Sequence, residues 1–136
     1  MSLNNCMKKN KDCERRYECD MHCHTTRSDG NDTPEELIEK AVNIGMKAIA
    51  IVDHDITPPL YVLNKGRKEV DTKWFARNKG LDLILGYEFS CDTYVDDVHI
   101  IGYELDWKNR LVTEEVKRAR ESKPEAYREL CSFLTE

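Results

Sequence analysis

The sequence predicts an α/β protein whose sheet is built from parallel strands. Three observations carry this prediction: a near-continuous apolar run at residues 47–52, a well-capped helical segment before it, and a short strand-like segment at residues 17–21. An apolar run of this length is typical of a strand that is buried on both faces, as in a parallel sheet covered by helices. Strand, helix and strand in this order form a βαβ unit, and such crossovers are almost always right-handed.

The helix of this unit has recognisable signals at both ends. Thr33 is a favourable N-cap, Pro34 suits the first helical position, and Glu36 completes a capping box. Gly45 is expected to end the helix. Between these signals, apolar residues recur at helical spacing: Leu37, Ile38, Ala41, Val42 and Ile44. We expect this stripe to pack in the core.

Further elements are expected after the buried run. Residues 65–78 are predicted to form a helix, which Gly80 ends. The apolar segment 81–85 is predicted as the next strand, and residues 98–103 as a further strand. Strands that alternate with helices in this way favour a parallel sheet.

We expect three regions along the chain. Residues 1–16 are polar, mixed in charge and without periodicity, which is typical of an irregular arm. Residues 17–110 are expected to form the α/β domain. Residues 111–136 are interpreted as a charged helical segment that starts an insertion, and Pro124 is expected to separate two helices within it.

Composition indicates a soluble globular protein of one domain. The chain has 136 residues, of which 40% are apolar and 35% are charged. Its formal net charge of −5 argues against a strong grip on nucleic acid through a basic surface. No apolar run approaches the roughly 20 residues of a membrane span, so no membrane partner is expected. The six cysteines are interpreted as reduced thiols, which makes the cytoplasm the expected location.

The segment from Asp20 to Asp29 predicts a metal site. In a β-strand, residues i and i+2 point to the same face, so His22 and His24 can aim at one point. Asp20 lies on that face as well, and Asp29 can return from the loop that follows. Cys23 should point to the opposite face and is expected in the core. Imidazole and carboxylate ligands that converge at a strand end suit zinc, manganese or iron.

Other polar residues are associated with the remaining predicted strands. The Asp-His-Asp triplet at 53–55 comes directly after the buried run, at the carboxyl end of a parallel strand, where α/β proteins carry their chemistry. Glu88 follows the next strand and a glycine, and His99 lies near the start of the last strand. All four histidines thus lie at strand ends or just inside strands, which favours a shared metal site over four unrelated positions.

Several of these residues have a second interpretation. Glu88 is either a solvated loop acid or a carboxylate that bridges two cations. Asp29 could be only the turn acid of a Ser-Asp-Gly turn. Asp20 and Asp53 could each orient an imidazole through its second nitrogen, or simply cap a loop. Arg27 could contact a phosphate, with a plain surface position as the alternative.

Four elements together resemble the PHP (polymerase and histidinol phosphatase) family. Asp-Met-His-Cys-His at 20–24, with Ser-Asp-Gly at 28–30, resembles its first motif, and Asp-His-Asp at 53–55 resembles its second. Gly-Tyr-Glu-Phe-Ser at 86–90 is similar to its G-x-E-x-S element, and His-Ile-Ile-Gly at 99–102 to its H-x-x-G strand. The four elements occur in the family's order, which makes the resemblance specific.

The resemblance implies a fold and an activity. The fold would be the N-terminal part of a distorted (β/α)7 barrel with parallel strands, followed by the C-terminal helical stretch. The activity would be hydrolysis of phosphoesters by metal-activated water, with two or three divalent ions of Zn, Mn or Fe. The Ser-Asp-Gly version of the first motif resembles the branch that includes small phosphoesterases acting on nucleotides. A small phosphorylated substrate is therefore expected.

The resemblance also implies roles for individual residues. The implied metal ligands are His22, His24, Asp29, His54, Glu88 and His99. The first two would bind one metal, which Glu88 would bridge to a second metal that His99 also binds. Asp29 and His54 would match ligands of a third. Catalysis is expected to depend most on His22, His24 and Glu88. Carboxylates expected behind the ligands are Asp20, Asp53 and Asp55.

One departure from the family leaves alternatives open. Full members continue well beyond this length and add ligands from later strands, whereas this chain has no histidine after His99. We therefore expect the sequence to be part of a longer one. Alternatively, a partner chain completes the barrel, or the chain is a catalytically incomplete metal-binding or interaction module. A proofreading segment of a DNA polymerase is disfavoured by the acidic net charge.

Overall fold

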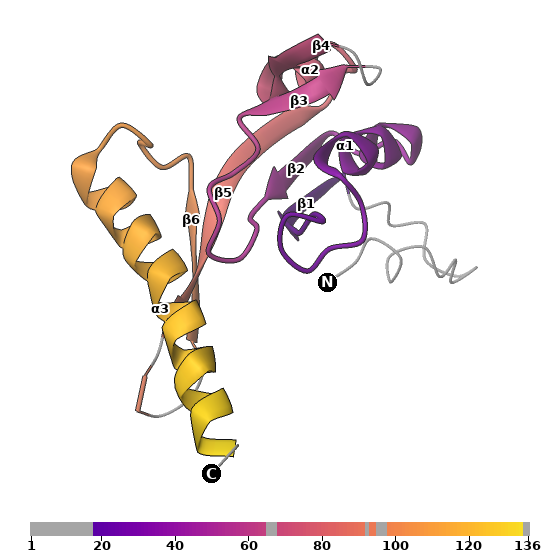
Figure 1. The fold of residues 1–136 in the computed structure, drawn as a ribbon. Helices are drawn as coiled ribbons and strands as arrows, with labels where there is room; N and C mark the ends of the chain where they lie inside the picture. Colours follow the sequence, from indigo (N-terminus) through magenta and orange to yellow (C-terminus); the bar gives the residue numbers. More distant parts are fainter. Residues whose placement is uncertain (1–17, 65–67, 92, 95–97, 135–136) are drawn as a thin grey trace.

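The computed structural model describes residues 18–64, 68–91, 93–94 and 98–134 (Figure 1). The predicted arm at residues 1–16 lies outside this part. The elements in chain order are β1 (Cys19–Cys23), α1 (Pro34–Asn43), β2 (Ala48–Ile51), β3 (Tyr61–Asn64), β4 (Lys68–Asp71), α2 (Thr72–Arg77), β5 (Asp82–Cys91), β6 (Val98–Tyr103) and α3 (Arg110–Leu134). A curled, mostly parallel sheet with helices forms a half-barrel, so the predicted α/β class is confirmed.

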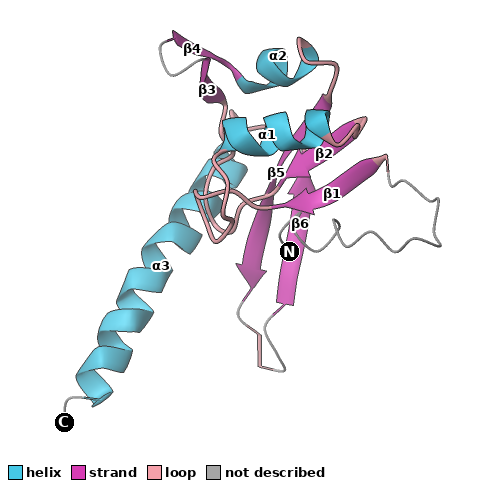
Figure 2. Cartoon of the chain, turned by 90° about the vertical axis from the view of Figure 1, so that its right-hand side faces the viewer, coloured by secondary structure: helices cyan, strands magenta, loops and turns pink. Residues whose placement is uncertain are grey.

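The main sheet has the strand order β1-β2-β5-β6. β1, β2 and β5 run parallel, and α1 covers one face of the sheet (Figure 2). β6 runs antiparallel to β5, so the expectation of parallel strands throughout is wrong at this edge. The connection from Cys91 to Val98 is much shorter than the roughly 12 residues that a parallel crossover needs. A short connection of this kind returns the chain antiparallel.

Helix α1 has the predicted signals at both ends. Thr33 Oγ1 accepts a hydrogen bond from the Glu36 amide at 3.3 Å, and Glu36 Oε2 accepts one from the Thr33 amide at 2.9 Å. Gly45 follows the helix with a φ of +82°, a conformation that glycine adopts readily. The apolar stripe packs in the core except for Ile44, which caps the helix and is 41% exposed.

The core lies between the main sheet and the elements that cover it. Its buried residues are Cys23, Leu37, Ile38, Ala41, Met46, Ile49, Ile51, Val62, Phe75, Ala76, Leu81, Leu83 and Leu85. Cys23 is 2% exposed, so the alternation along β1 predicted its direction correctly. Burial raises the pKa of the Cys23 thiol to about 12, so this side chain is a neutral core residue.

The helix expected at residues 65–78 is only partly present. Its first three residues lie outside the described part, residues 68–71 form β4, and only Thr72–Arg77 is helical. β4 pairs antiparallel with β3, a strand without a clear local signal, and this pairing sets Val62 opposite Val70. Val62 of β3 belongs to the core and Val70 of β4 packs against it, so tertiary packing of the hairpin outweighs the helix propensity of this segment.

Helix α3 runs without interruption from Arg110 to Leu134, and its C-terminal part diverges from the sheet (Figure 2). The predicted break at Pro124 is therefore wrong. Proline removes a helical hydrogen bond, but glutamate, lysine and arginine, which have high helix propensity, are frequent on both sides of it. Among the described residues, no helix combines the length and the apolar character needed to cross a membrane.

β5 is longer than predicted and carries Glu88 within the strand. Pairing with β6 extends it to Cys91, with Glu88 opposite Ile101. On its other side, the Glu88 amide donates to the Asp53 carbonyl at 3.3 Å, and the Glu88 carbonyl accepts from the Asp55 amide at 3.0 Å. Glu88 is only 2% exposed, so the interpretation as a solvated loop acid is wrong.

Glu104 closes the pairing of β5 with β6. Its amide donates to the Leu85 carbonyl at 2.9 Å, and its Oε1 accepts from the Leu85 amide at 3.1 Å. Its carboxylate also pairs with Lys73, which ties α2 to the sheet. Burial opposes ionisation of Glu104, but the hydrogen bonds from Lys73 and Leu85 outweigh it and hold the pKa of this carboxyl below its ordinary value.

We predict that Glu104→Ala lowers the free energy of unfolding by about 1 kcal/mol at neutral pH, because a hydrogen bond and a half-exposed ion pair are lost. The folded-state pKa lies below the unfolded value of 4.5, so this stabilisation is present above pH 4.5 and is lost as the pH falls through the folded pKa. Urea unfolding at a series of pH values measures it. Glu104→Gln, which keeps an acceptor for the Leu85 amide, should retain part of the stability. A deficit in the alanine variant that grows as the pH falls would contradict this account.

Candidate metal centre

Four imidazoles meet one buried carboxylate where the parallel strands end. The carboxylate is that of Glu88 on β5, and the imidazoles come from β1, from the residue after it, from the turn after β2 and from β6: His22, His24, His54 and His99. Neighbouring rings in this order have centroids 5.0, 4.6 and 4.8 Å apart. The cluster therefore draws on both edges and the middle of the main sheet.

Glu88 is the centre of this cluster. Its Oε2 lies 2.9 Å from His22 Nε2, 3.0 Å from His24 Nε2 and 3.5 Å from His54 Nε2. Its Oε1 lies 3.0 Å from His99 Nδ1. Burial opposes ionisation, but the hydrogen bond with His22 and the neighbouring imidazoles hold the pKa of Glu88 below its ordinary value. The carboxylate is therefore ionised and joins the two ends of the cluster.

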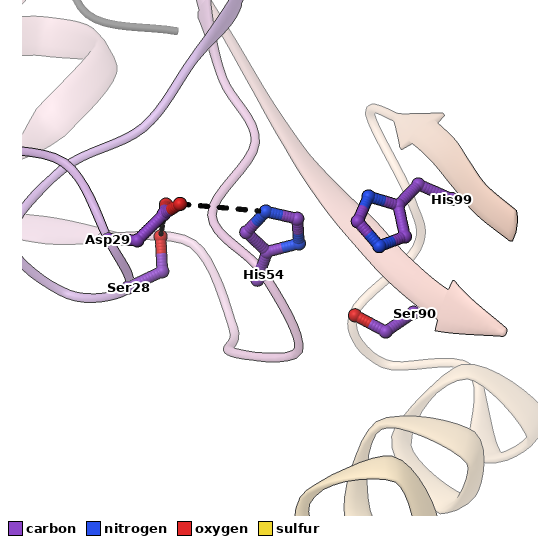
Figure 3. Close-up of a pocket in the computed structure, with 5 residues that line it drawn as sticks. All are labelled: Ser28, Asp29, His54, Ser90 and His99. Atoms are coloured by element: carbon purple, nitrogen blue, oxygen red, sulfur yellow. Dashed lines mark hydrogen bonds and ion pairs between the residues drawn. The ribbon is translucent and has the colours of Figure 1, made fainter. Parts of the chain in front are cut away.

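Asp29 reaches the cluster from the loop after β1. Its Oδ1 lies 3.0 Å from His24 Nδ1, and its Oδ2 lies 3.9 Å from His54 Nε2. Figure 3 shows Asp29 facing His54. Burial opposes ionisation, but His24, His54 and the hydrogen bond from Ser28 together outweigh it and lower the pKa of Asp29. The side chain is 68% exposed, so it offers an ionised carboxylate on the open side of the cluster.

Within the described residues, three sets of side chains could each hold a metal ion. The sets are His22, His24 and Glu88; His24, Asp29 and His54; and His54, Glu88 and His99. The ligand atoms of each set lie within 4.8 Å of one another. A pocket of about 410 Å³ opens onto the last two sets (Figure 3), and it is lined by Ser28, Asp29, His54, Ser90 and His99.

The contacts of His24 fit bound cations. Burial lowers the pKa of His24, so the ring is neutral and carries one N–H. Both ring nitrogens nevertheless lie 3.0 Å from a carboxylate oxygen, Nδ1 from Asp29 and Nε2 from Glu88. One contact therefore sets a lone pair against an anion, and a cation between the two atoms would remove that repulsion. Two ligand atoms that bind the same ion, each at about 2.1 Å, lie roughly 3.0–3.4 Å from one another. The nitrogen–oxygen distances of His24 are close to this separation.

Asp53 holds the loop that carries His24 and Asp29. It is fully buried, and its Oδ1 accepts hydrogen bonds from the Thr25 amide at 2.6 Å and the Ser28 hydroxyl at 2.8 Å. Its Oδ2 accepts from the Thr25 hydroxyl at 2.8 Å. These contacts match the loop-capping interpretation of Asp53, because its carboxylate binds the loop instead of an imidazole.

Asp20 and Asp55 also bind backbone groups. Asp20 Oδ1 accepts from the His22 amide at 3.1 Å, and Asp55 Oδ1 accepts from the Ser90 amide at 3.0 Å. Asp55 has a φ of +49°, in the left-handed region that aspartate tolerates better than most residues. Both carboxylates therefore support the backbone next to the cluster.

Comparison with known proteins identifies the family of this chain. The PHP domain matches residues 20–135, which is most of the sequence. The chain belongs to the PHP domain family. It is 37% identical over 95 residues to the 5'-3' exoribonuclease Rnm of Escherichia coli, a match that covers 70% of this chain and 30% of the relative.

A curated relative and a solved structure from Chromobacterium violaceum are also similar to this PHP domain. The 3',5'-nucleoside bisphosphate phosphatase is 29% identical over 115 residues, which are 85% of this chain and 37% of the relative. The solved structure of an amidohydrolase with bound sulfate and no metal has a TM-score of 0.68 at 27% identity, and the match covers 88% of this chain and 39% of that chain. The present chain thus spans about a third of the length of the curated relatives it matches.

Arg27 is not among the residues that line the pocket of this PHP domain. Its guanidinium donates to the Thr57 carbonyl at 3.0 Å, which ties the loop after β1 to the loop after β2. Ser28 and Ser90 line the pocket. No role was predicted for these two serines from the sequence, although both lie inside elements that resemble PHP motifs.

Gly30 allows the loop after β1 to pass close to His24. A Cβ at this position would lie 2.2 Å from the His24 carbonyl oxygen and 2.4 Å from its carbonyl carbon. The Gly30 amide donates to the Thr25 carbonyl at 2.9 Å, which fixes this close approach. The glycine of the Ser-Asp-Gly motif is thus needed for close contact of two backbone segments.

We predict that Gly30→Ala weakens Mn²⁺ binding by about 10-fold or more, because the loop must move His24 and Asp29 away from the cluster. Calorimetric titration of chelator-treated protein measures the affinity. Gly45→Ala is the matched control, since its Cβ meets nothing within 4 Å. The positive φ at Gly45 should lower stability by about 1 kcal/mol without changing the affinity. Equal affinity in Gly30→Ala and wild type would refute the role given to this loop.

Proposed function

We propose that this chain carries the metal centre of a phosphoesterase that acts on small phosphorylated molecules. The observation that carries the proposal is the position of Glu88. Its two oxygens face histidines from opposite edges of the sheet, His22 on β1 and His99 on β6. A carboxylate in this position suits the bridge between cations in a two-metal site for phosphoester hydrolysis. The chain spans only part of its relatives, so the activity of the whole protein is part of the proposal.

The proposed cofactors are two or three divalent ions of Zn, Mn or Fe, and their ligands are the three sets described above. Glu88 belongs both to the set with His22 and to the set with His99. Asp29 belongs to the remaining set, with His24 and His54. Imidazole and carboxylate donors suit these metals. Bound ions of this kind supply a water nucleophile at neutral pH and stabilise negative charge on phosphate oxygens.

The chain's own residues hold the ligands in the required protonation states. The lowered pKa of Glu88 keeps its carboxylate ionised, and the lowered pKa of His24 keeps a ring lone pair available. The hydroxyl of Ser90 can donate a hydrogen bond to a phosphate oxygen in the pocket, whereas the Ser28 hydroxyl already donates to Asp53. A covalent nucleophile is not required, and Cys23 is unsuited to that role because its thiol is buried with a pKa of about 12.

The proposed substrate is a small phosphorylated nucleotide. A pocket of about 410 Å³ suits a ligand of that size, and the net charge of −5 disfavours a long nucleic acid. One relative is a 3',5'-nucleoside bisphosphate phosphatase, which supports this class, while the exoribonuclease relative makes an RNA end the competing substrate. Arg27, next to Ser28 in the loop, is proposed to contact a phosphate of the substrate.

We also propose that the curled sheet is the first part of a distorted (β/α)7 barrel, which further chain or a partner chain would complete. The solved amidohydrolase structure supports this, because the present chain covers only 39% of it. Three of the described cysteines, Cys19, Cys23 and Cys91, are free thiols, which fits a reducing compartment such as the cytoplasm.

The direct test is hydrolysis by chelator-treated protein that is reloaded with Mn²⁺ or Zn²⁺. The substrates are p-nitrophenyl phosphate, adenosine 3',5'-bisphosphate and a short 5'-phosphorylated RNA. We expect turnover of the bisphosphate and a loss of about 100-fold or more in His22→Ala and in Glu88→Gln, since each removes a proposed metal ligand. Glu69→Gln, the same change at an exposed position on β4, should leave turnover unchanged.

The outcomes separate the proposal from its alternatives. Faster hydrolysis of the RNA than of the bisphosphate would replace the proposed substrate class. Bound cations without turnover of any substrate would favour a metal-binding or interaction module. Absence of cation binding in the wild type would overturn the metal centre itself.

A further inference from the structure

Strand β1 contains a bulge at the position of His22. In the pairing with β2, Asp20 is opposite Ile49 and Cys23 is opposite Ile51, so two residues, Met21 and His22, stand against the single residue between Ile49 and Ile51. A bulge disrupts the hydrogen-bonded ladder locally and redirects the side chains that it carries. His22 therefore lies on an edge strand at the point where pairing with β2 fixes it least.

Side chains bind both polar groups of the Met21–His22 peptide. The His22 amide donates to Asp20 Oδ1 at 3.1 Å, and the Met21 carbonyl accepts from the Tyr103 hydroxyl at 2.8 Å. Tyr103 is the last residue of β6, which forms the opposite edge of the main sheet. The peptide before His22 is thus held from one side by its own strand and from the other by the far edge.

The contact from Tyr103 to β1 depends on the curl of the sheet. In a flat sheet, three strand spacings of about 4.8 Å would separate β6 from β1, roughly 14 Å in all, and a tyrosine side chain reaches only about half of that distance. Gly86, which pairs with Tyr103, leaves room for the ring: a Cβ at Gly86 would lie 3.3 Å from Tyr103 Cδ1 and 2.8 Å from Val52 Cγ1. The ring can therefore cross β5 on the concave side.

We propose that Tyr103, together with Asp20, is a positioning residue that fixes the peptide before His22 and so aims this imidazole at Glu88. We call these two hydrogen bonds, from the Tyr103 hydroxyl and to the Asp20 carboxylate, the clamp. His22 needs it because its side chain is 45% exposed and has few neighbours to hold it, whereas that of His24 is 5% exposed and is held by its surroundings. The Tyr103 hydroxyl couples the edge that carries His22 to the edge that carries His99. The role in cation binding rests on the proposed function, but the clamp itself does not.

The test uses Tyr103→Phe, which removes one hydroxyl and keeps the ring. Tyr61→Phe is the matched control, because Tyr61 lies on β3 and is 62% exposed. In metal-free protein, the NMR signal of the His22 amide should shift in Tyr103→Phe and stay unchanged in Tyr61→Phe. On titration with Zn²⁺, Tyr103→Phe should bind about 3- to 10-fold more weakly, as expected for one lost hydrogen bond. The Zn²⁺-induced shift of the His22 ring nitrogens should shrink, while that of His99 is retained.

Two further variants test the other half of the clamp. Asp20→Asn keeps an oxygen acceptor for the His22 amide and should bind Zn²⁺ nearly as the wild type does, whereas Asp20→Ala should be as impaired as Tyr103→Phe. An unshifted His22 amide in Tyr103→Phe, or equal losses at His22 and His99 together with a lower melting temperature, would overturn the positioning role. If the wild type binds no Zn²⁺, the proposed function fails while the amide measurement still tests the clamp.

Discussion

The carboxylate of Glu88 places a negative charge at a position that is 3% exposed, and such a charge is costly to bury unless partners surround it. The chain surrounds it with four imidazoles, two from the strands β1 and β6 and two from the segments that follow β1 and β2. β5 carries Glu88 past its first half, and β6 pairs with it and brings His99 to the same carboxylate. The turn after β2 pairs with β5 at Glu88 and brings His54 there. The curl of the sheet lets both edges contribute to the same point.

The parts of the fold that were predictable are those with local signals. The capping box at Thr33 and the apolar run at 47–52 each arise from short-range chemistry, so α1 and β2 follow from the sequence. The β3–β4 hairpin was not predictable, because its strands are short and Val62 is buried by neighbours distant in sequence. The uninterrupted α3 shows a different limit, since a proline is a strong but not an absolute signal for the end of a helix.

The candidate site divides in the same way. The histidines, Asp29 and Glu88 were predictable as candidates because their spacing within motifs follows strand ends, and the structure brings them together. The contacts behind them carry no such pattern. Asp53 binds Thr25 and Ser28 across 25 or more residues, and Tyr103 reaches Met21 over 82 residues. Such contacts depend on how the sheet curls, which a reading of local periodicity does not contain.

The central claim is that the imidazoles and carboxylates around Glu88 bind divalent cations. Anomalous diffraction from crystals grown with Mn²⁺ or Zn²⁺ tests it most directly. The account predicts at least two anomalous peaks, each at about 2.0–2.2 Å from imidazole nitrogens and carboxylate oxygens of the sets that share Glu88. Crystals with full-occupancy cations elsewhere and no peak beside Glu88 would contradict it.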